Sequence, residues 1–222
     1  MTDSPHDSLI RGLAADLTPV RPLPHPALRA LGWLAAVVAL GLGLAVISDV
    51  QAMWARIAGA PDLWLAALGS AATAVLAGVA AFELSLPDAR RAWALLPLPG
   101  ALLWVGASGV GCLRAWIAPQ AHVAALDETG DCLMFIVALS LPLSALLLLM
   151  LRRGCPLNPG LTATVAGLAV AAAAATLLNL FHPFDAAVTD LAVHAFAVAL
   201  VVMANRALGG RIFAAPQFAP VK

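Results

Sequence analysis

The sequence predicts an all-α, polytopic membrane protein with six transmembrane helices and both termini in the cytoplasm. Three observations support this fold class: an apolar composition, six apolar runs of bilayer length, and basic residues concentrated on one side of those runs. Of the residues, 62% are hydrophobic and only 11% are charged, whereas about 25% charged is typical of soluble domains. The formal net charge is zero, so composition gives no indication of direct nucleic-acid binding.

Six apolar runs are each long enough to cross a bilayer. A helix needs about 20 apolar residues to span a hydrocarbon core of about 30 Å. The runs are rich in alanine, glycine and leucine, as expected where small residues let helix backbones approach closely. The expected spans are residues 30–48, 63–83, 92–112, 132–151, 160–181 and 188–208. The chain therefore divides into a cytoplasmic arm for partner docking, a six-helix transmembrane domain and a cytoplasmic tail, at residues 1–28, 29–208 and 209–222.

Basic residues are distributed unevenly between the two sides of the predicted helices. With a cytoplasmic N-terminus, ten of them fall on the inner side and two on the outer side. This is the positive-inside pattern, which places both termini in the cytoplasm. Trp33 and Trp93 are then expected at the inner interface, and Trp54, Trp64 and Trp116 at the outer one. The inner basic residues are Arg11, Arg21, Arg29, Arg90, Arg91, Arg152, Arg153, Arg206, Arg211 and Lys222, and the outer ones are Arg56 and Arg114.

The N-terminal arm contains a short amphipathic segment. Asp7 or Ser8 is expected to cap a helix of about ten residues, which is too short to be stable alone in water. Its apolar side would carry Leu9, Ile10, Leu13 and Leu17. Two interpretations remain open, docking to a partner protein or lying on the lipid surface. Prolines are expected to end the helix and form a stiff spacer to the membrane, at Pro19, Pro22, Pro24 and Pro26.

Two cysteines are expected to reach the outer membrane face at the same depth. Cys112 lies 21 residues after Arg91, and Cys132 lies 20 residues before Arg152. At about 1.5 Å per residue both gaps are about 30 Å, so arginines at one face place both thiols at the other. The short loop expected between the cysteines carries a histidine and three carboxylates, namely His122, Asp127, Glu128 and Asp131.

Two more histidines belong to the outer part of the predicted bundle. His182 lies between the last two spans, and His194 lies about two to three turns inside the last one. Thiolate and imidazole ligands suit a transition-metal ion, and Cys112, Cys132 and His182 are its candidate ligands. A disulfide between the two cysteines is a second interpretation, because the outer side of a bacterial inner membrane is oxidising. The third is that both cysteines are small packing residues.

Prolines are expected to kink the two helices that carry these cysteines. Pro97 and Pro99 lie in the third span, and Pro142 lies in the fourth. A kink frees backbone carbonyls and makes two alternative packings of a helix conceivable. A change at the outer face could then alter how the N-terminal arm is presented at the inner face.

Short motifs along nearly the whole chain resemble those of one protein family. Residues 9–23 (LIRGLAADLTPVRPL) resemble the start of NrsF-type proteins. These are six-span membrane anti-sigma factors that restrain an extracytoplasmic-function sigma factor. Together with six spans and a cytoplasmic N-terminus, the motifs are fairly specific. Further matches, in order, are residues 92–98 (AWALLPL), 111–113 (GCL), 138–142 (ALSLP), 151–154 (LRRG) and 181–183 (FHP).

The resemblance implies a function and a location in the bacterial inner membrane. The cytoplasmic arm would hold the sigma factor, and outer residues would respond to metal or oxidative stress. In the family a cysteine often occurs in the last outer loop, where this chain has His182 and Pro183, so Cys112 or His182 would have to substitute for it. The implied partner-binding residues are Leu9, Ile10, Leu13, Asp16, Leu17, Pro19 and Arg21. The candidate sensing residues are Cys112, Cys132, His122, Asp131, His182 and His194.

An enzymatic function is not expected from the motifs. The sequence lacks Cys-x-x-Cys, His-Glu-x-x-His, Gly-x-Ser-x-Gly and a phosphate-binding glycine loop. The alternative function is a small metal-ion or metabolite transporter. Against it, charged residues at mid-membrane depth are essentially missing, and no three-span repeat is evident. Beyond the sigma factor and the lipid bilayer, the sequence is compatible with a homo-oligomer.

Overall fold

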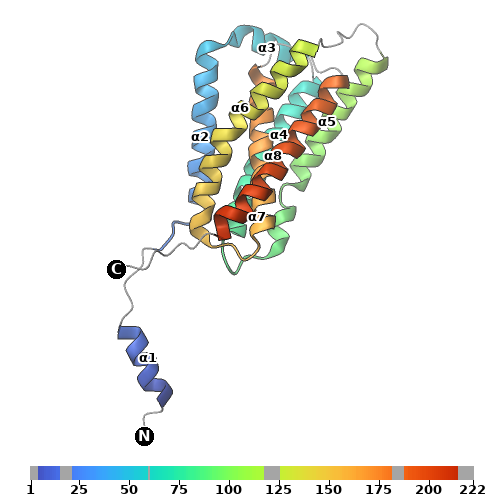
Figure 1. Cartoon of the computed structure of the whole chain (residues 1–222). Coiled ribbons are helices and arrows are strands. Elements are labelled where there is room, and N and C mark those ends of the chain that lie inside the picture. Colours follow the sequence, from blue (N-terminus) through green and yellow to red (C-terminus); the bar gives the residue numbers. More distant parts are fainter. Residues whose placement is uncertain (1–4, 16–21, 60, 118–125, 182–187, 215–222) are drawn as a thin grey trace.

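A computed structural model describes residues 5–15, 22–59, 61–117, 126–181 and 188–214 (Figure 1). It confirms the all-α class, and six of its helices are long and apolar enough to cross a membrane. The long helices are α2 (Pro26–Ile47), α4 (Pro61–Leu84), α5 (Leu98–Ile117), α6 (Leu126–Leu151), α7 (Pro159–Phe181) and α8 (Val188–Ala214). The shorter elements are α1 (Pro5–Ala15), α3 (Val50–Gly59) and the 3₁₀ turns η1 (Arg91–Leu95) and η2 (Arg152–Gly154).

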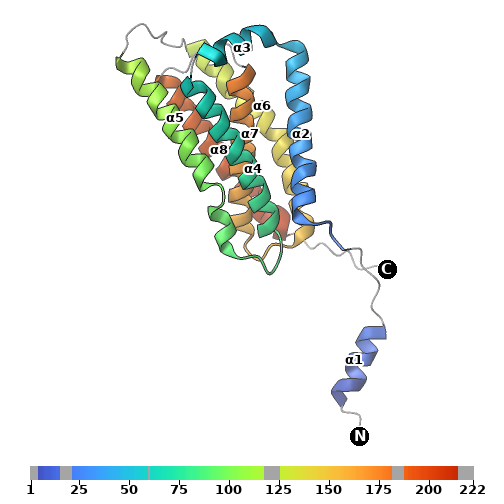
Figure 2. The same ribbon diagram turned by 180° about the vertical axis from the view of Figure 1, so that it is seen from behind.

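The six long helices form one bundle with α7 at its centre. Helices α4, α6 and α8 all pack against α7, α5 packs mainly against α4, and α2 lies at the periphery (Figures 1 and 2). Alanines fill most of the buried surface of α7, including Ala171, Ala172 and Ala174, which are fully buried. Because alanine side chains are short, the neighbouring helices approach this helix closely.

Glycines allow the closest helix contacts. A Cβ atom on Gly69 of α4 would lie 2.5 Å from the backbone nitrogen of Trp104 in α5. A Cβ atom on Gly100 of α5 would lie 2.8 Å from the backbone nitrogen of Thr73 in α4. These two glycines, one on each helix, determine how closely α4 and α5 pack together.

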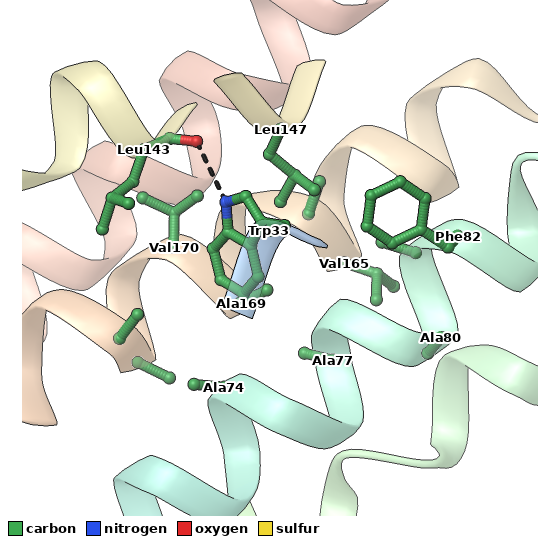
Figure 3. Close-up of a cluster of buried hydrophobic side chains, with 14 of the residues drawn as sticks. Trp33, Ala74, Ala77, Ala80, Phe82, Leu143, Leu147, Val165, Ala169 and Val170 are labelled. Carbon is green, nitrogen blue, oxygen red and sulfur yellow. Dashed lines mark hydrogen bonds between the residues drawn. The ribbon is translucent and has the colours of Figure 1, made fainter. Parts of the chain in front are cut away.

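Trp33 of α2 is the largest side chain in the core. It was expected at the inner interface, but it is 0% exposed and packs among α4, α6 and α7 (Figure 3). Its indole Nε1 donates a hydrogen bond of 3.3 Å to the backbone carbonyl of Leu143 in α6. A Cβ atom on Gly78 would lie 3.2 Å from the indole ring, so this glycine leaves room for it. This burial was not evident from the sequence, because the polar partner of the indole lies on another helix inside the bundle.

Several helix boundaries differ from the sequence expectations. Helix α1 begins at Pro5, so the expected cap at Asp7 or Ser8 is wrong, as proline at a first helical position already satisfies that end. Helix α3 was not expected at all. The third span is broken into η1 and α5, with Pro97 at the break, because proline cannot donate the helical hydrogen bond there. Helix α8 continues past residue 208 to Ala214.

Candidate functional site

Helix α1 presents an uncovered apolar face. Leu9, Ile10 and Leu13 are 61%, 62% and 63% exposed, and the helix lies outside the bundle (Figure 1). At 100° per residue these three side chains share one side of the helix. The remaining residues implied for partner binding, Asp16, Leu17, Pro19 and Arg21, lie outside the described residues.

A capped helix start joins the arm to the bundle. His25 precedes α2, and its ring Nδ1 accepts a hydrogen bond of 3.2 Å from the backbone nitrogen of Ala27. Pro26 occupies the first turn, where its missing N–H costs nothing. The described chain therefore enters α2 through a capped first turn.

The two cysteines of interest lie at matching places on their helices. Cys112 is five residues before the end of α5 at Ile117, and Cys132 is six residues after the start of α6 at Leu126. Both positions are near the end of the bundle opposite the arm (Figure 1). The structure does not describe the side chains of either cysteine.

The acidic residues expected in a loop belong to a helix instead. Because α6 already begins at Leu126, Asp127, Glu128 and Asp131 lie in its first two turns. Carboxylates are favourable there, since the N-terminal end of a helix carries a partial positive charge. The loop expectation is therefore wrong for these three residues.

The candidate histidines are only partly covered by the structure. His194 lies on α8 and is half-buried. His122 and His182 lie outside the described residues. Among the side chains that the structure does describe, no three His, Cys, Asp or Glu residues gather as a metal site.

Helix α8 packs against both helices that carry the cysteines. It contacts α5 and α6, whereas the described residues of α5 and α6 make few or no contacts with one another, and α8 runs between them (Figure 1). His194 therefore lies on the helix that separates Cys112 from Cys132.

The opposite end of the bundle contains a buried arginine. Arg29, in the first turn of α2, is 7% exposed. One terminal nitrogen donates to Ser85 Oγ at 3.3 Å, the other donates to the backbone carbonyl of Met150, and the guanidinium lies 4.9 Å from the ring centroid of Phe82. From the sequence, Arg29 was predicted only to lie at the inner face. A lone arginine in the first turn of a helix does not by itself indicate burial.

Further polar contacts bind the helix ends around Arg29. Thr162 Oγ1, at the start of α7, donates to the backbone carbonyl of Leu84 at 3.1 Å. A Cβ atom on Gly154 would lie 2.5 Å from the backbone oxygen of Ser85, so η2 lies directly on the end of α4. The ends of α2, α4, α6 and α7 are thus held together where the arm begins.

Two of these contacts connect α2 to α6. The indole of Trp33 bonds Leu143 of α6, directly after Pro142, and Arg29 bonds Met150 about two turns further on. Both donors come from the helix that leads to the arm. Both acceptors lie on the helix that carries Cys132.

These features define a class: a multi-pass membrane protein that carries an exposed amphipathic helix outside its bundle of long helices. The chain belongs to the NrsF family, described as negative regulator of sigma F, whose family model matches residues 13–214. It is therefore a membrane anti-sigma factor that regulates transcription, and not an enzyme. No curated protein and no solved structure shows significant similarity to the chain.

Proposed function

We propose that the protein holds its sigma factor on the apolar face of α1 and releases it when outer-face residues respond to metal or oxidative stress. The observation that carries this proposal is the exposure of Leu9, Ile10 and Leu13 on a helix that the bundle leaves uncovered. An amphipathic helix of this kind binds by placing its apolar face in a hydrophobic groove of a partner. Asp16, Leu17, Pro19 and Arg21 extend the proposed contact along the arm.

The proposed orientation places the arm in the cytoplasm, where sigma factors act. Arg29, Arg90, Arg91, Arg152 and Arg153 lie at the end of the bundle where the arm begins. Cytoplasmic ends of membrane helices carry such an excess of positive charge. The positive-inside pattern therefore supports an inner-membrane protein with residues 1–28 and 209–222 on the cytoplasmic side.

The proposed sensor consists of thiols and imidazoles at the opposite end. Cys112 and Cys132 lie near the ends of α5 and α6, with Asp131 beside one of them and His194 on the helix between. Thiolates and imidazoles bind soft or borderline metal ions. Alternatively, peroxide oxidises the two thiols to a disulfide and is itself reduced to two molecules of water. His122 and His182 complete the candidate set.

Helix α6 gives the signal a physical route to the arm. A shift of α6 at Cys132 would move the carbonyls of Leu143 and Met150, which accept hydrogen bonds from Trp33 and Arg29 of α2. Pro142 interrupts the hydrogen bonding of α6 next to the first of these acceptors. The first turn of α2 would then move, and the direction of the arm would change with it.

The docking half is tested by placing a charge on each side of α1. Leu13→Asp puts a carboxylate on the apolar face, and burying that charge in a partner groove should weaken binding by about 100-fold or more. Ala15→Asp is the matched control, since it adds the same charge about 200° around the helix from Leu13. Binding of the cognate sigma factor to full-length protein in nanodiscs measures both variants.

The expected pattern is a large loss for Leu13→Asp and near-wild-type binding for Ala15→Asp. Equal loss in both variants would mean that charge anywhere on the arm is harmful. Wild-type binding of Leu13→Asp would show that α1 is not the docking element.

The sensing half is tested with the double variant Cys112→Ser, Cys132→Ser. A sigma-dependent reporter should no longer respond to Zn²⁺, Cu²⁺ or hydrogen peroxide, because neither metal ligation nor disulfide formation remains. Cys155→Ser is the control at the other end of the bundle and should respond normally. His182→Ala should abolish the metal response alone if that histidine is a ligand. A normal response of the double variant would show that both thiols are packing residues and not sensors.

A further inference from the structure

Arg29 carries a positive charge that nothing in the described part of the chain neutralises. Its contacts are a hydroxyl, a backbone carbonyl and an aromatic ring. None of these groups has a negative charge. A cation that is 93% buried is costly unless a nearby anion offsets it. An anion is therefore needed close to this guanidinium.

A second arginine increases that need. Arg153 precedes Gly154, which packs against Ser85, the residue whose hydroxyl Arg29 bonds. The positive charge of Arg153 is therefore close enough to repel that of Arg29. Arg153 itself is exposed. At this end the described residues supply only two carboxylates, Glu83 and Asp88, and neither forms an ion pair with Arg29. The two guanidinium groups thus form a small positive centre, in which Arg29 is buried and Arg153 is exposed.

Membrane position determines which anion is available. Arg29 and Arg153 lie at helix ends, where a bilayer places its phosphate groups. Guanidinium groups match the oxygen geometry of phosphate and bind it with charge-assisted hydrogen bonds. Leu28 and Leu31, beside Arg29 on α2, are 63% and 60% exposed and offer apolar surface to acyl chains.

We propose that Arg29 and Arg153 form a binding site for the phosphate of an anionic phospholipid, between the start of α2 and the end of α6. The phosphate sits over the exposed guanidinium of Arg153 and offsets the charge of Arg29 beneath it. The acyl chains run along α2. Because the site requires only a bilayer surface at this end, it stands independently of the sigma factor and of the outer sensor.

Lipid addition to the purified full-length protein tests the site. Native mass spectrometry counts bound phosphatidylglycerol, phosphatidylcholine or inorganic phosphate, and thermal unfolding reports stabilisation by each at equal ionic strength. Wild-type protein should retain phosphatidylglycerol and unfold at a higher temperature in its presence. Arg153→Gln should weaken that binding about tenfold, the effect of losing one charge-assisted hydrogen bond.

Arg91→Gln is the matched control, because it removes an exposed arginine at the same end of the bundle but on η1. It should retain wild-type lipid binding. Equal losses in Arg153→Gln and Arg91→Gln would show a general charge effect and overturn the proposal. Stabilisation by inorganic phosphate equal to that by phosphatidylglycerol would identify a free anion instead of a lipid. Absence of any anion effect on the wild type would also overturn it.

Discussion

Helices α7 and α2 are similarly apolar but occupy opposite positions in the bundle. Their mean hydropathies are 2.0 and 2.4, yet 78% of the α7 window is buried inside the protein and only 11% of the α2 window. The difference lies in side-chain size. Alanines dominate α7, whereas α2 exposes larger side chains such as Val38, Leu42 and Val46. In a bilayer, where lipid is as apolar as leucine, small residues decide which helix is central.

The comparison also shows how differently the two helices are held. Close backbone packing holds α7, and Gly167 approaches α8 so tightly that its Cβ would lie 2.8 Å from Val202 Cα. Helix α2 is mostly exposed, and its buried residues, which include Arg29 and Trp33, lie in its first half, where these two also form hydrogen bonds to α6. The helix that leads to the arm is therefore joined to α6 by hydrogen bonds from its first half, whereas α7 is held by close backbone packing.

The largest expected effect is at the packed helix. Gly167→Ala places a methyl group against the backbone of α8 and should destabilise the protein by about 2 kcal/mol. Gly43→Ala in α2, where nothing lies within 4 Å, should change stability by less than about 0.5 kcal/mol. Unfolding in mixed micelles with increasing denaturing detergent measures both. Equal effects of the two substitutions would break the distinction between packed and peripheral helices.

A smaller effect is expected at the polar contact of α2. Trp33→Phe keeps an aromatic ring in the core but removes the donor to Leu143, so it should cost about 1 kcal/mol. Trp64→Phe is the control, because Trp64 on α4 is 44% exposed and should tolerate the change. The same unfolding assay applies. If both variants unfold alike, the hydrogen bond to α6 does not fix α2.

The smallest expected effect concerns a hydroxyl contact inside the central pair of helices. Thr176 Oγ1 of α7 donates to Ser70 Oγ of α4 at 2.9 Å. Thr176→Val should cost about 0.6 kcal/mol, the average for such bonds between membrane helices. Thr164→Val removes a hydroxyl that bonds Gly160 of its own helix and serves as the control. If Thr176→Val lowers the free energy of unfolding more than Gly167→Ala does, then polar contacts, and not packing, hold α7.

The sequence alone predicted part of the candidate site, whereas the burial of other residues was visible only in the folded structure. The apolar stripe of Leu9, Ile10 and Leu13 was evident from helical periodicity, because the helix stands alone. The positions of Cys112 and Cys132 near the ends of α5 and α6 followed from counting residues along the helices. The burial of Arg29 and Trp33 did not follow from the sequence, since both residue types are usual at membrane interfaces. Their hydrogen-bond partners lie at the end of α4 and on α6, so their burial depends on how these helices pack.

By itself the sequence determined the six spans, because a bilayer of fixed thickness reduces the question to the length and hydropathy of each run. It also determined the family, because the family model matches residues 13–214. Only the tertiary structure decided the order of helices in the bundle, with α7 central and α8 between α5 and α6. That order depends on how small residues such as Gly69, Gly100 and Gly167 fit opposing backbones. Such a fit between distant segments leaves no mark in the hydropathy of either one.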